Sequence, residues 1–373
     1  MRYLVTGGAG FIGSNLVRNL LQDPANEVVN LDALTYAGNL DSLRDVEGNS
    51  RYQFLHIDLR DGPAVRQAVL DLRPDGIFHL AAESHVDRSI DGPGDFIHTN
   101  ILGTYHLLQA AVATWKGPNS KFQTPSGKSP RFLHVSTDEV YGSLREEDPG
   151  FTETTRYNPH SPYSASKAAS DHLVRAWHDT YGLPVIVANC SNNYGPWQFP
   201  EKLIPMVILR ALAGRPIPVY GNGGNIRDWL HVEDQCRALK AVMGEGTPGA
   251  SYNIGGGNEV RNIDLVRSLC RILDELLADR RARAQPIPPR EAPSSLNTEH
   301  SPLESLIRFV PDRPGHDFRY AIDDSKIRTE LDWHPRHDFD SGLRSTVKWY
   351  LENQDWWRKI LDHSSPLERL GVV

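Results

Sequence analysis

The chain begins with a short apolar run and a glycine-rich turn, RYLVTGGAGFIG at residues 2–13. The apolar run predicts a buried strand, and residues 11–21 have the spacing of a helix. Glycines at 7, 10 and 13 allow a tight turn and a close approach of backbone to a ligand. The helix N-terminus then offers unpaired N–H groups to a phosphate. The stretch therefore predicts a strand–turn–helix unit that holds a dinucleotide, with a purely structural turn as the alternative.

The second apolar run, residues 27–31, ends at Asp32. A carboxylate at this place can accept hydrogen bonds from a ribose diol, and it would repel a 2′-phosphate. We therefore expect NAD, and not NADP, as the cofactor.

Apolar runs and helical stretches alternate through the first half of the chain. The expected strands are residues 2–5, 27–31, 53–57, 76–80, 131–135 and 184–189. The expected helices are residues 11–21, 62–72, 96–113 and 161–181. This alternation predicts the α/β class, with a doubly wound parallel sheet of the Rossmann type.

The alternation of strands and helices becomes less regular from about residue 191. Pro and Gly are frequent there, and the expected helices 203–213 and 232–243 are separated by loops. We expect residues 1–190 to form an NAD-binding domain. Residues 191–373 should form mainly a smaller α+β substrate-binding domain, from which the chain could cross back to the first. A basic run at 280–283 and a Pro-rich stretch at 286–302 predict a solvated helix end and an exposed loop.

Composition excludes several classes of protein. The 373 residues are 39% hydrophobic and 23% charged, which is ordinary for a globular chain. No apolar run reaches the roughly 18 residues of a membrane span, and no signal peptide precedes the first strand, so we expect a cytoplasmic protein. A net charge of −7 argues against nucleic-acid binding. The three cysteines form no CxxC pair and the fifteen histidines no HExxH motif, so we expect no metal site.

Tyr163 and Lys167, in the stretch YSASK, lie four residues apart and so on one face of an expected helix. A free phenol has a pKa near 10, too high for a base at neutral pH. A nearby ammonium and a nicotinamide cation would both favour phenolate, which makes the pair a workable base for a hydroxyl group. A surface pair without function is the alternative for this motif alone.

The segment VSTDEVYG at residues 135–142 follows an expected buried strand, so its polar side chains should emerge where parallel sheets bind ligands. Asp138 and Glu139 are adjacent carboxyl groups there, which is costly unless they are solvated or used. Elimination of water needs a base and an acid, and repulsion between neighbouring carboxylates helps to keep one of them protonated. A strand-end turn with exposed acids is the alternative.

The chain resembles the extended short-chain dehydrogenase/reductase family at two motifs, TGxxGxxG at residues 6–13 and YxxxK at 163–167. The resemblance implies hydride transfer between NAD and a carbinol carbon, with Lys167 also binding the nicotinamide ribose. Within that family the chain is most similar to the dTDP-glucose 4,6-dehydratases. The stretches that carry this similarity are residues 79–89, 136–142, 189–196, 199–205, 227–230 and 312–323. They cover most of residues 1–335, whereas 116–130, 278–308 and the tail after 352 match poorly.

This resemblance implies a reaction and a set of residues. Tyr163 would deprotonate the glucose 4-hydroxyl, with Thr137 bonded to the same oxygen; Glu139 would act at carbon 5 and Asp138 at the 6-hydroxyl. The implied cofactor contacts are Gly7, Gly10, Phe11, Ile12, Gly13, Asp32, Ala33, Leu34, Thr35, Asp58, Leu59, Leu80, Ala81, Ala82, Ser84, Thr99, Tyr163, Lys167 and Asn193. The implied contacts to a nucleotide-diphosphate hexose are Ser84, Thr137, Asp138, Glu139, Tyr163, Asn192, Lys202, Leu203, Pro218, Val219, Tyr220, Arg227, Asn262, Asp312 and His316.

Three alternatives stay open at this point. A nucleotide-sugar 4-epimerase would share the fold but leave the Asp138–Glu139 pair without a role. A non-catalytic NAD-binding sensor would not need Thr137, Tyr163 and Lys167 together. A dehydratase could also act on UDP- or CDP-glucose. The resemblance further implies a homodimer formed through a helical bundle, which helices 96–113 and 161–181 could provide.

Overall fold

The computed structural model describes residues 1–117, 121–124, 127, 129–286 and 302–363. The Pro-rich stretch expected to form an exposed loop lies outside the described residues, except for its two end residues.

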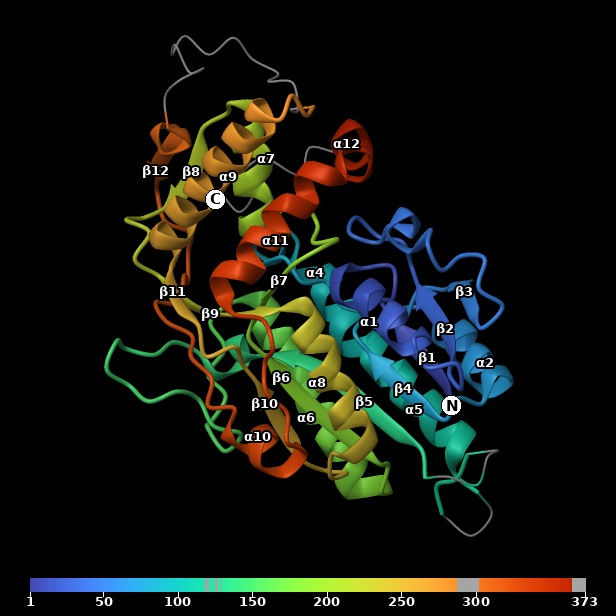
Figure 1. Cartoon of the computed structure of the whole chain (residues 1–373). Coiled ribbons are helices and arrows are strands. Elements are labelled where there is room, and N and C mark those ends of the chain that lie inside the picture. Colours follow the sequence, from blue (N-terminus) through green and yellow to red (C-terminus); the bar gives the residue numbers. More distant parts are fainter. Residues whose placement is uncertain (118–120, 125–126, 128, 287–301, 364–373) are drawn as a thin grey trace.

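A seven-stranded parallel sheet forms the centre of the molecule, in the order β10-β6-β5-β4-β1-β2-β3 (Figure 1). Its strands are β1 (Arg2–Thr6), β2 (Glu27–Asp32), β3 (Tyr52–His56), β4 (Gly76–His79), β5 (Arg131–Thr137), β6 (Val185–Cys190) and β10 (Ser251–Ile254). Every neighbouring pair is parallel. The expected doubly wound sheet is confirmed, and the six strands expected in the first half all lie in it.

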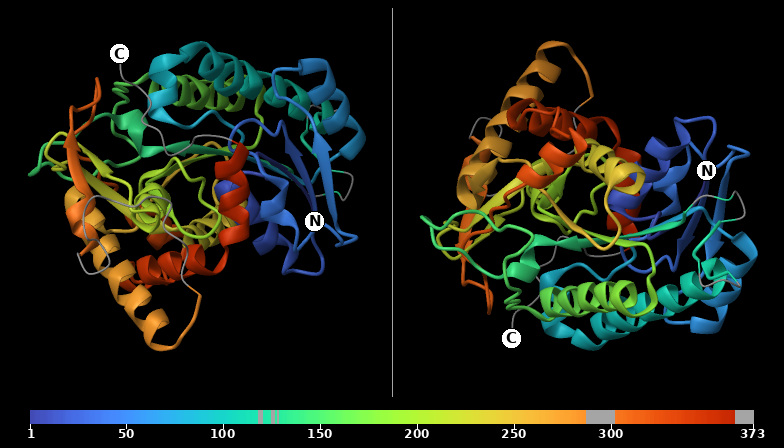
Figure 2. Two further views of the ribbon diagram at one scale, coloured as in Figure 1. Left: turned by 90° about the horizontal axis from the view of Figure 1, so that it is seen from above. Right: turned by 90° about the horizontal axis from the view of Figure 1, so that it is seen from below.

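Helices cover both faces of this sheet, which is why its strands are almost continuously apolar. The helices on one face are α1 (Phe11–Leu21) and α8 (Val232–Glu245), which pack together. The helices on the other face are α2 (Gly62–Leu72), α5 (Thr104–Trp115) and α6 (Pro162–Tyr181). Figure 2 shows these two layers on either side of the strands. Consecutive residues therefore enter different cores: Val5 and Leu133 pack toward α1 and α8, whereas Leu4 and Phe132 pack toward α5.

The rest of the chain builds a second lobe beside the carboxyl ends of the strands. Its strands are β7 (Asn192–Tyr194), β8 (Ile217–Tyr220), β9 (Ile226–His231), β11 (Glu259–Arg261) and β12 (Ile307–Val310). Its helical elements are α7 (Leu203–Ala213), α9 (Asn262–Ala282), η4 (Leu303–Leu306), α11 (Phe339–Glu352) and α12 (Gln354–His363). The sheets are β11-β9-β7 and β12-β8. Helix α9 ends within the basic run, as expected for a solvated helix end.

The two halves of the sequence interleave. Strand β10 comes from the second half of the chain but pairs with β6 at the edge of the central sheet. Helix α8, which follows β9, packs Leu239 and Val242 into the core beneath the sheet. Helix α10 (Ser325–Leu331) adds Ile327 to the same core. The chain thus returns to the first lobe twice after residue 231.

The helix expected over residues 96–113 is interrupted. Helices α3 (Val86–Asp91) and α4 (Pro93–Phe96) precede a π-helical turn, η2 (Ile97–Gly103), which leads into α5. The Asn100 side chain accepts from the backbone N–H of Glu83 and donates to the Glu83 carbonyl and to Ser166 Oγ. A π-turn widens a helix by one residue and often occurs at functional sites. Here it fastens the Glu83 backbone to α6.

Among the described residues, no helix is both long and apolar enough to span a membrane.

The glycine turn after β1 gives a stability prediction. A Cβ at residue 13 would lie 2.0 Å from the Gly7 carbonyl oxygen and 2.7 Å from the Gly8 Cα, and neither backbone atom can move cheaply. We expect Gly13→Ala to lower the free energy of unfolding by about 1–3 kcal/mol, the usual cost of overpacking. Gly244→Ala is the control, because a Cβ there, near the end of α8, meets nothing within 4 Å. Denaturant titration should show Gly244→Ala unchanged or slightly stabilised; equal stability of the two variants would show that the turn can absorb a side chain at residue 13.

Candidate active site

The glycine turn joins β1 to α1 at the carboxyl edge of the sheet. Gly7 has φ +73°, and a Cβ on it would lie 2.7 Å from the backbone nitrogen of Ala81. Helix α1 begins at Phe11 behind Gly10, with no side-chain cap and no acid in its first turn. Its N–H groups therefore remain available to an anion, and the turn leaves room for one.

Asp32, at the end of β2, was predicted to bind a ribose diol, and its carboxylate also accepts two backbone hydrogen bonds. One carboxylate oxygen accepts from the backbone N–H of Ala9 at 2.9 Å, and the other from that of Leu34 at 2.8 Å. A carboxylate can accept about four hydrogen bonds, so two sites stay available for a ribose diol. Asp32 thus links the glycine turn to the loop after β2.

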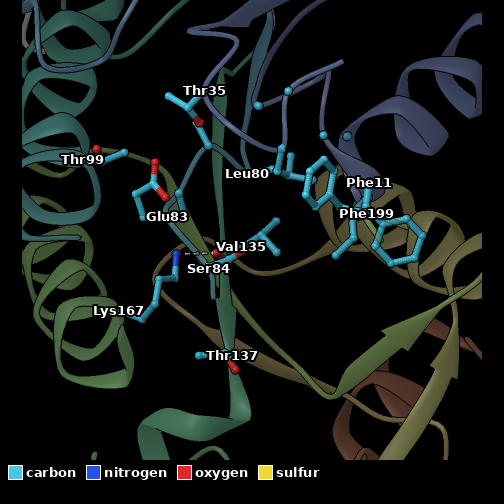
Figure 3. Close-up of a pocket in the computed structure, with 18 of the residues that line it drawn as sticks. Phe11, Thr35, Leu80, Glu83, Ser84, Thr99, Val135, Thr137, Lys167 and Phe199 are labelled. Atoms are coloured by element: carbon cyan, nitrogen blue, oxygen red, sulfur yellow. Dashed lines mark hydrogen bonds between the residues drawn. The ribbon is translucent and has the colours of Figure 1, made fainter. Parts of the chain in front are cut away.

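A large cavity opens where β1, β4, β5 and β6 end (Figure 3). The expected cofactor residues that line it are Gly7, Gly10, Phe11, Ile12, Gly13, Asp32, Ala33, Thr35, Asp58, Leu59, Leu80, Ala81, Ala82, Ser84, Thr99, Tyr163, Lys167 and Asn193. The expected substrate residues that line it are Ser84, Thr137, Asp138, Glu139, Tyr163, Asn192 and Lys202. Buried carbonyl oxygens of the Asn192 and Asn193 side chains have no partner among the described residues, which suits a polar ligand.

Helix α6 presents Tyr163 and Lys167 to this cavity. Ser161 starts the helix through a capping box with Ser164. The Lys167 ammonium donates to the Val135 carbonyl oxygen at 2.8 Å, a bond drawn in Figure 3. Burial lowers the pKa of Lys167 to about 8, against the opposing charge of Asp171. The ammonium is therefore held rigidly at the end of β5.

Burial and neighbouring groups act on the pKa of Tyr163 in opposite directions. Burial, and then the neighbouring Glu139, raise the pKa of Tyr163 well above its usual value, while a hydrogen-bonding interaction with Thr137 lowers it. The prediction that Lys167 and a nicotinamide cation together make the phenol a base stays a prediction. A second positive charge is needed, and a nicotinamide cation in the cavity would supply it.

Asp138 and Glu139 occupy a 3₁₀ turn, η3 (Asp138–Tyr141), directly after β5. Thr137 caps this turn by accepting from the Glu139 backbone N–H at 3.2 Å. Both carboxyl groups line the cavity, and Asp138 is only 1% exposed. The alternative of solvent-exposed acids is therefore excluded.

The surroundings of Asp138 and Glu139 act differently on the pKa of the two carboxyl groups. Burial raises the pKa of Asp138 well above its usual value, and the charges of Glu139 and Asp228 add to the rise. Burial also raises the pKa of Glu139, but Arg313, Arg227 and Lys202 oppose that rise. The neighbouring cations therefore favour the ionised form of Glu139 relative to that of Asp138, the kind of difference that can separate a base from an acid.

The cations near Glu139 come from the second lobe. Arg227, on β9, is buried and donates to the backbone carbonyls of Ile226 at 2.7 Å and Asp317 at 3.0 Å. The Lys202 ammonium donates to the Ser84 carbonyl at 2.8 Å and so reaches across to the first lobe. Buried cations in an acidic protein suit a diphosphate.

The remaining expected residues lie beyond the main cavity. Leu34 contributes its backbone N–H to Asp32. Val219 is buried in the core of the second lobe, and Leu203 is partly buried against that core. Pro218 and Tyr220 lie on β8, Asn262 begins α9, and Asp312 binds His316 at 2.6 Å beside the Tyr220 ring. Tyr220, Asp312 and His316 lie near Arg313.

Sequence reasoning missed several residues of the site. Arg313 stands in a stretch that carried the resemblance, yet only its pairing with Asp87 at 3.1 Å identifies it as a cation of the site. Tyr220 donates to the same carboxylate at 2.8 Å. Glu83 and Cys190 also line the cavity. Arg313 and Glu83 each lie next to an expected residue in the sequence, and Cys190 lies two residues before Asn192, but no pattern distinguished them from their neighbours.

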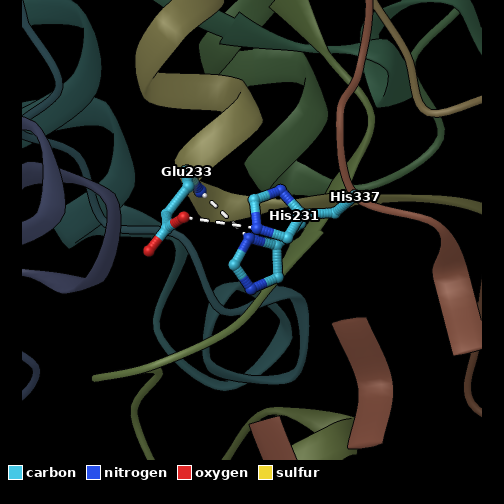
Figure 4. A group of neighbouring side chains, drawn as sticks. All are labelled: His231, Glu233 and His337. Carbon is cyan, nitrogen blue, oxygen red and sulfur yellow. Dashed lines mark hydrogen bonds and ion pairs between the residues drawn. The ribbon is translucent and has the colours of Figure 1, made fainter. Parts of the chain in front are cut away.

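Within the described part of the chain, His231, Glu233 and His337 lie close enough to suggest a metal site (Figure 4). The two imidazole rings stack at 4.0 Å with 25° between their planes, so their in-plane lone pairs run side by side and do not converge on one ion. His337 is instead bonded to Asp234 at 3.0 Å and paired with Glu233 at 3.3 Å. We therefore assign the group a structural role, joining the segment before α11 to the start of α8.

The family model described as GDP-mannose 4,6 dehydratase matches residues 4–346. The dTDP-glucose 4,6-dehydratase of Escherichia coli is 54% identical over 381 aligned residues, covering 100% of each chain. A similarly named protein of Neisseria meningitidis is 55% identical over 373 residues, covering 100% of this chain and 99% of the other.

Solved structures of similar proteins have the same fold. The dTDP-glucose 4,6-dehydratase of Streptomyces venezuelae, crystallised with NAD, superimposes with a TM-score of 0.82 at 43% identity, covering 96% of this chain and 100% of the other. The UDP-glucose 4-epimerase of Thermus thermophilus, also with NAD, has a TM-score of 0.76 at 28% identity, covering 94% and 99%. The fold is therefore common to both reactions, whereas sequence identity is higher with the dehydratase.

The buried acid gives a prediction about stability and pH. An unfolded aspartate loses its proton above about pH 4, whereas folded Asp138 keeps it, so this residue destabilises the fold increasingly as pH rises toward its raised pKa. Asp138→Asn should therefore gain free energy of unfolding over the parent protein between about pH 4 and pH 7, by up to about 1.4 kcal/mol per pH unit.

Denaturant titrations of both proteins across this pH range measure the difference. Asp332→Asn, at a fully exposed carboxylate, is the matched control and should show no such trend. A difference for Asp138→Asn that does not change with pH would contradict a buried neutral acid.

Proposed function

The chain belongs to the family that the GDP-mannose 4,6 dehydratase model describes, and on that premise we propose that it is an NAD-dependent dTDP-glucose 4,6-dehydratase. It is a hydro-lyase that converts dTDP-glucose to the 4-keto-6-deoxy sugar nucleotide and water. One observation carries the proposal beyond the fold. Asp138 and Glu139, in opposite environments, share a cavity with Thr137, Tyr163 and Lys167.

The residues that would hold NAD fit its parts. The glycine turn and the start of α1 would hold a pyrophosphate, Asp32 would bind a ribose diol, and Lys167 and Asn193, which also line the cavity, would contact the nicotinamide half. When bound, NAD accepts a hydride and later donates it. The chain's own residues supply binding, orientation and all proton transfers.

The first proton transfer belongs to Tyr163. In its ionised form, the Tyr163 phenolate takes the proton of the sugar 4-hydroxyl and becomes a phenol, and the Thr137 hydroxyl holds the same oxygen in place. Lys167 stabilises the negative charge that develops. The resulting ketone at carbon 4 acidifies the hydrogen on carbon 5.

Elimination then uses the two acids. Glu139, whose raised pKa is opposed by the charges of three cations, removes the proton from carbon 5 in its ionised form. Asp138, kept protonated by burial, protonates the departing 6-hydroxyl, so water leaves. Glu139 returns its proton to carbon 5 when carbon 6 is reduced. An epimerase would use neither acid, so we place that activity second.

The second lobe binds the nucleotide diphosphate. Lys202, Arg227 and Arg313 provide the positive charge, and Tyr220 with His316 form an aromatic corner for the base. We assign residues 1–190 mainly to NAD and residues 191–373 mainly to the sugar nucleotide. Thymine specificity rests on the dTDP-glucose relatives, and UDP- or CDP-glucose is the competing substrate.

We further infer a homodimer in the cytoplasm. Ile97 and Leu102 on η2, Tyr105 on α5 and Tyr181 on α6 are exposed by 50%, 43%, 39% and 44%. Trp177 contacts both tyrosines edge-on, so the aromatic surface is continuous across α5 and α6. Two copies of this face would bury it in a four-helix bundle.

The substrate assignment is tested by mass. The purified protein, incubated separately with dTDP-, UDP-, CDP- and GDP-hexoses, should remove water from dTDP-glucose faster than from the others. A product of unchanged mass but altered configuration at carbon 4 would instead identify an epimerase.

The role of Glu139 is tested by isotope exchange. Glu139→Gln should still oxidise carbon 4 slowly, yet lose solvent deuterium incorporation at carbon 5, with overall turnover lower by roughly 10²–10⁴-fold. Glu83→Gln removes another carboxylate from the cavity and should retain exchange. Exchange that persists in Glu139→Gln would reject Glu139 as the base.

Dimer formation is tested by changing the exposed helical face. Leu102→Glu places a charge where the second copy would pack, so light scattering should report half the parent mass with the fold intact. Leu40→Glu, at another exposed leucine outside this face, should leave the mass unchanged. A parent protein with the mass of one chain would overturn the dimer.

A further inference from the structure

Helix α6 carries three titratable side chains at intervals of four residues, Tyr163, Lys167 and Asp171. This spacing places them in line along one face of the helix. All three are buried, with exposed fractions of 9%, 4% and 0%. The proposed reaction gives Tyr163 and Lys167 a role but leaves Asp171 without one, although a fully buried carboxyl group is costly for the fold.

The Asp171 carboxyl group is bonded as a carboxylate. Its Oδ2 accepts from three side chains: Ser136 Oγ at 2.8 Å, the Tyr157 hydroxyl at 2.8 Å and Asn189 Nδ2 at 3.3 Å. Several donors on a carboxyl group favour its ionised form. Burial acts to raise the pKa of Asp171, but the hydrogen bonds and charges around it lower the pKa below its usual value. The first lobe therefore holds a buried negative charge, which an opposite charge must balance.

The imidazole of His134, on β5, links this carboxylate to Lys167. Its Nε2 lies 3.2 Å from Asp171 Oδ1 and 3.5 Å from the Lys167 Nζ. Burial lowers the pKa of His134 to about 4, so the ring is neutral at neutral pH and cannot balance the carboxylate. The Lys167 ammonium can, because its bond to the Val135 carbonyl holds it near the same ring nitrogen (Figure 3). Opposite charges separated by one imidazole nitrogen still attract each other strongly in a water-free interior.

Other titratable groups face the pair from the neighbouring elements. They are His79 on β4, Cys190 on β6, Tyr163 and Arg175 on α6, Tyr157 before α6, and Asp138 and Glu139 on η3. Burial lowers the pKa of His79 well below its usual value and raises the pKa of Cys190 to about 12, so both are neutral. Arg175 donates to the Tyr157 hydroxyl at 2.6 Å, so its charge reaches Asp171 across that group. Of the two cations, Lys167 is the one that is fully buried with Asp171.

We propose that Asp171 is the counter-ion of Lys167, and that its charge keeps the lysine protonated in the cavity and thereby sets the pH range in which Tyr163 can act as the base. This inference rests on the proposed dehydratase function. Asp171 does not line the cavity, so it is a positioning residue that acts through Lys167. A purely structural role is the alternative, because its hydrogen bonds also join β5, β6 and the segment before α6.

The pH dependence of turnover tests the role of the charge. Burial lowers the pKa of Lys167 to about 8, so the parent protein, loaded with NAD, should lose activity on dTDP-glucose as pH rises above this value. Asp171→Asn keeps the size of the side chain but removes the charge that favours the ammonium. This variant should lose activity at a pH lower by about 1–2 units, because a neighbouring opposite charge shifts a pKa by roughly that amount.

Tyr157→Phe is the matched control. It removes one hydrogen bond to Asp171 but keeps the carboxylate, so activity should be lost at the same pH as in the parent protein. A purely structural Asp171 would lower activity equally at every pH. An unshifted pH profile in Asp171→Asn, or the same shift in Tyr157→Phe, would overturn the proposal.

A second measurement needs no turnover. Lys167→Met removes the positive charge, and denaturant titration of the full chain with saturating NAD gives the unfolding midpoint with and without the Asp171→Asn change. In the parent protein, Lys167→Met leaves the buried carboxylate unbalanced, so the loss of stability should be large. In Asp171→Asn the loss should be much smaller or reversed. Equal losses in the two backgrounds would show that the two charges do not interact.

The same comparison holds if Asp171→Asn alone does not fold. Adding Lys167→Met should then restore folding, whereas a double variant that also fails to fold would show that Asp171 serves the fold and not the charge of Lys167. A parent protein that removes no water from any sugar nucleotide would overturn the proposed function instead. The denaturant titrations would still decide whether the two charges are coupled.

Discussion

The structure depends on the burial of two adjacent carboxyl groups at the end of β5. Burial raises the pKa of both acids, and their proximity penalises charging both at once. The two acids have different surroundings. Three cations oppose the rise in the pKa of Glu139, whereas the charges of Glu139 and Asp228 add to the rise in the pKa of Asp138. In the function that we propose, a pair that would destabilise an ordinary strand end supplies an acid and a base in fixed positions.

The remainder of the architecture serves that arrangement. Strand β5 is central in the sheet, so its end faces both the glycine turn after β1 and the loop after β6. Helix α6 fixes Tyr163 and Lys167 beside it. The cations come from segments far away in the sequence, and Lys202 bonds directly to the first lobe through Ser84. The difference between the surroundings of the two acids therefore depends on cations that the second lobe supplies.

The sequence predicted the central sheet well for a physical reason. Strands covered on both faces are continuous apolar runs, and the glycine spacing at residues 7–13 has few other uses. The sequence did not predict β10, which contributes only four residues to the sheet edge. It also did not predict the π-turn at η2, where the Asn100 side chain bonds to the Glu83 backbone. The acids and the Tyr163–Lys167 pair were predicted by chemistry. The pKa of Tyr163, the role of Asp32 within its own turn, and the Asp87–Tyr220–Arg313 cluster were not, because they follow from contacts between distant segments.

Within one cavity, the hydrogen removed from carbon 4 should return at carbon 6 after the paired acids have expelled the hydroxyl group there. The most direct measurement starts from dTDP-glucose carrying deuterium at carbon 4 and locates the label in the product by NMR. We expect the deuterium to lie on carbon 6 of a 4-keto-6-deoxy product. Deuterium still attached to carbon 4, or lost to solvent, would contradict this transfer.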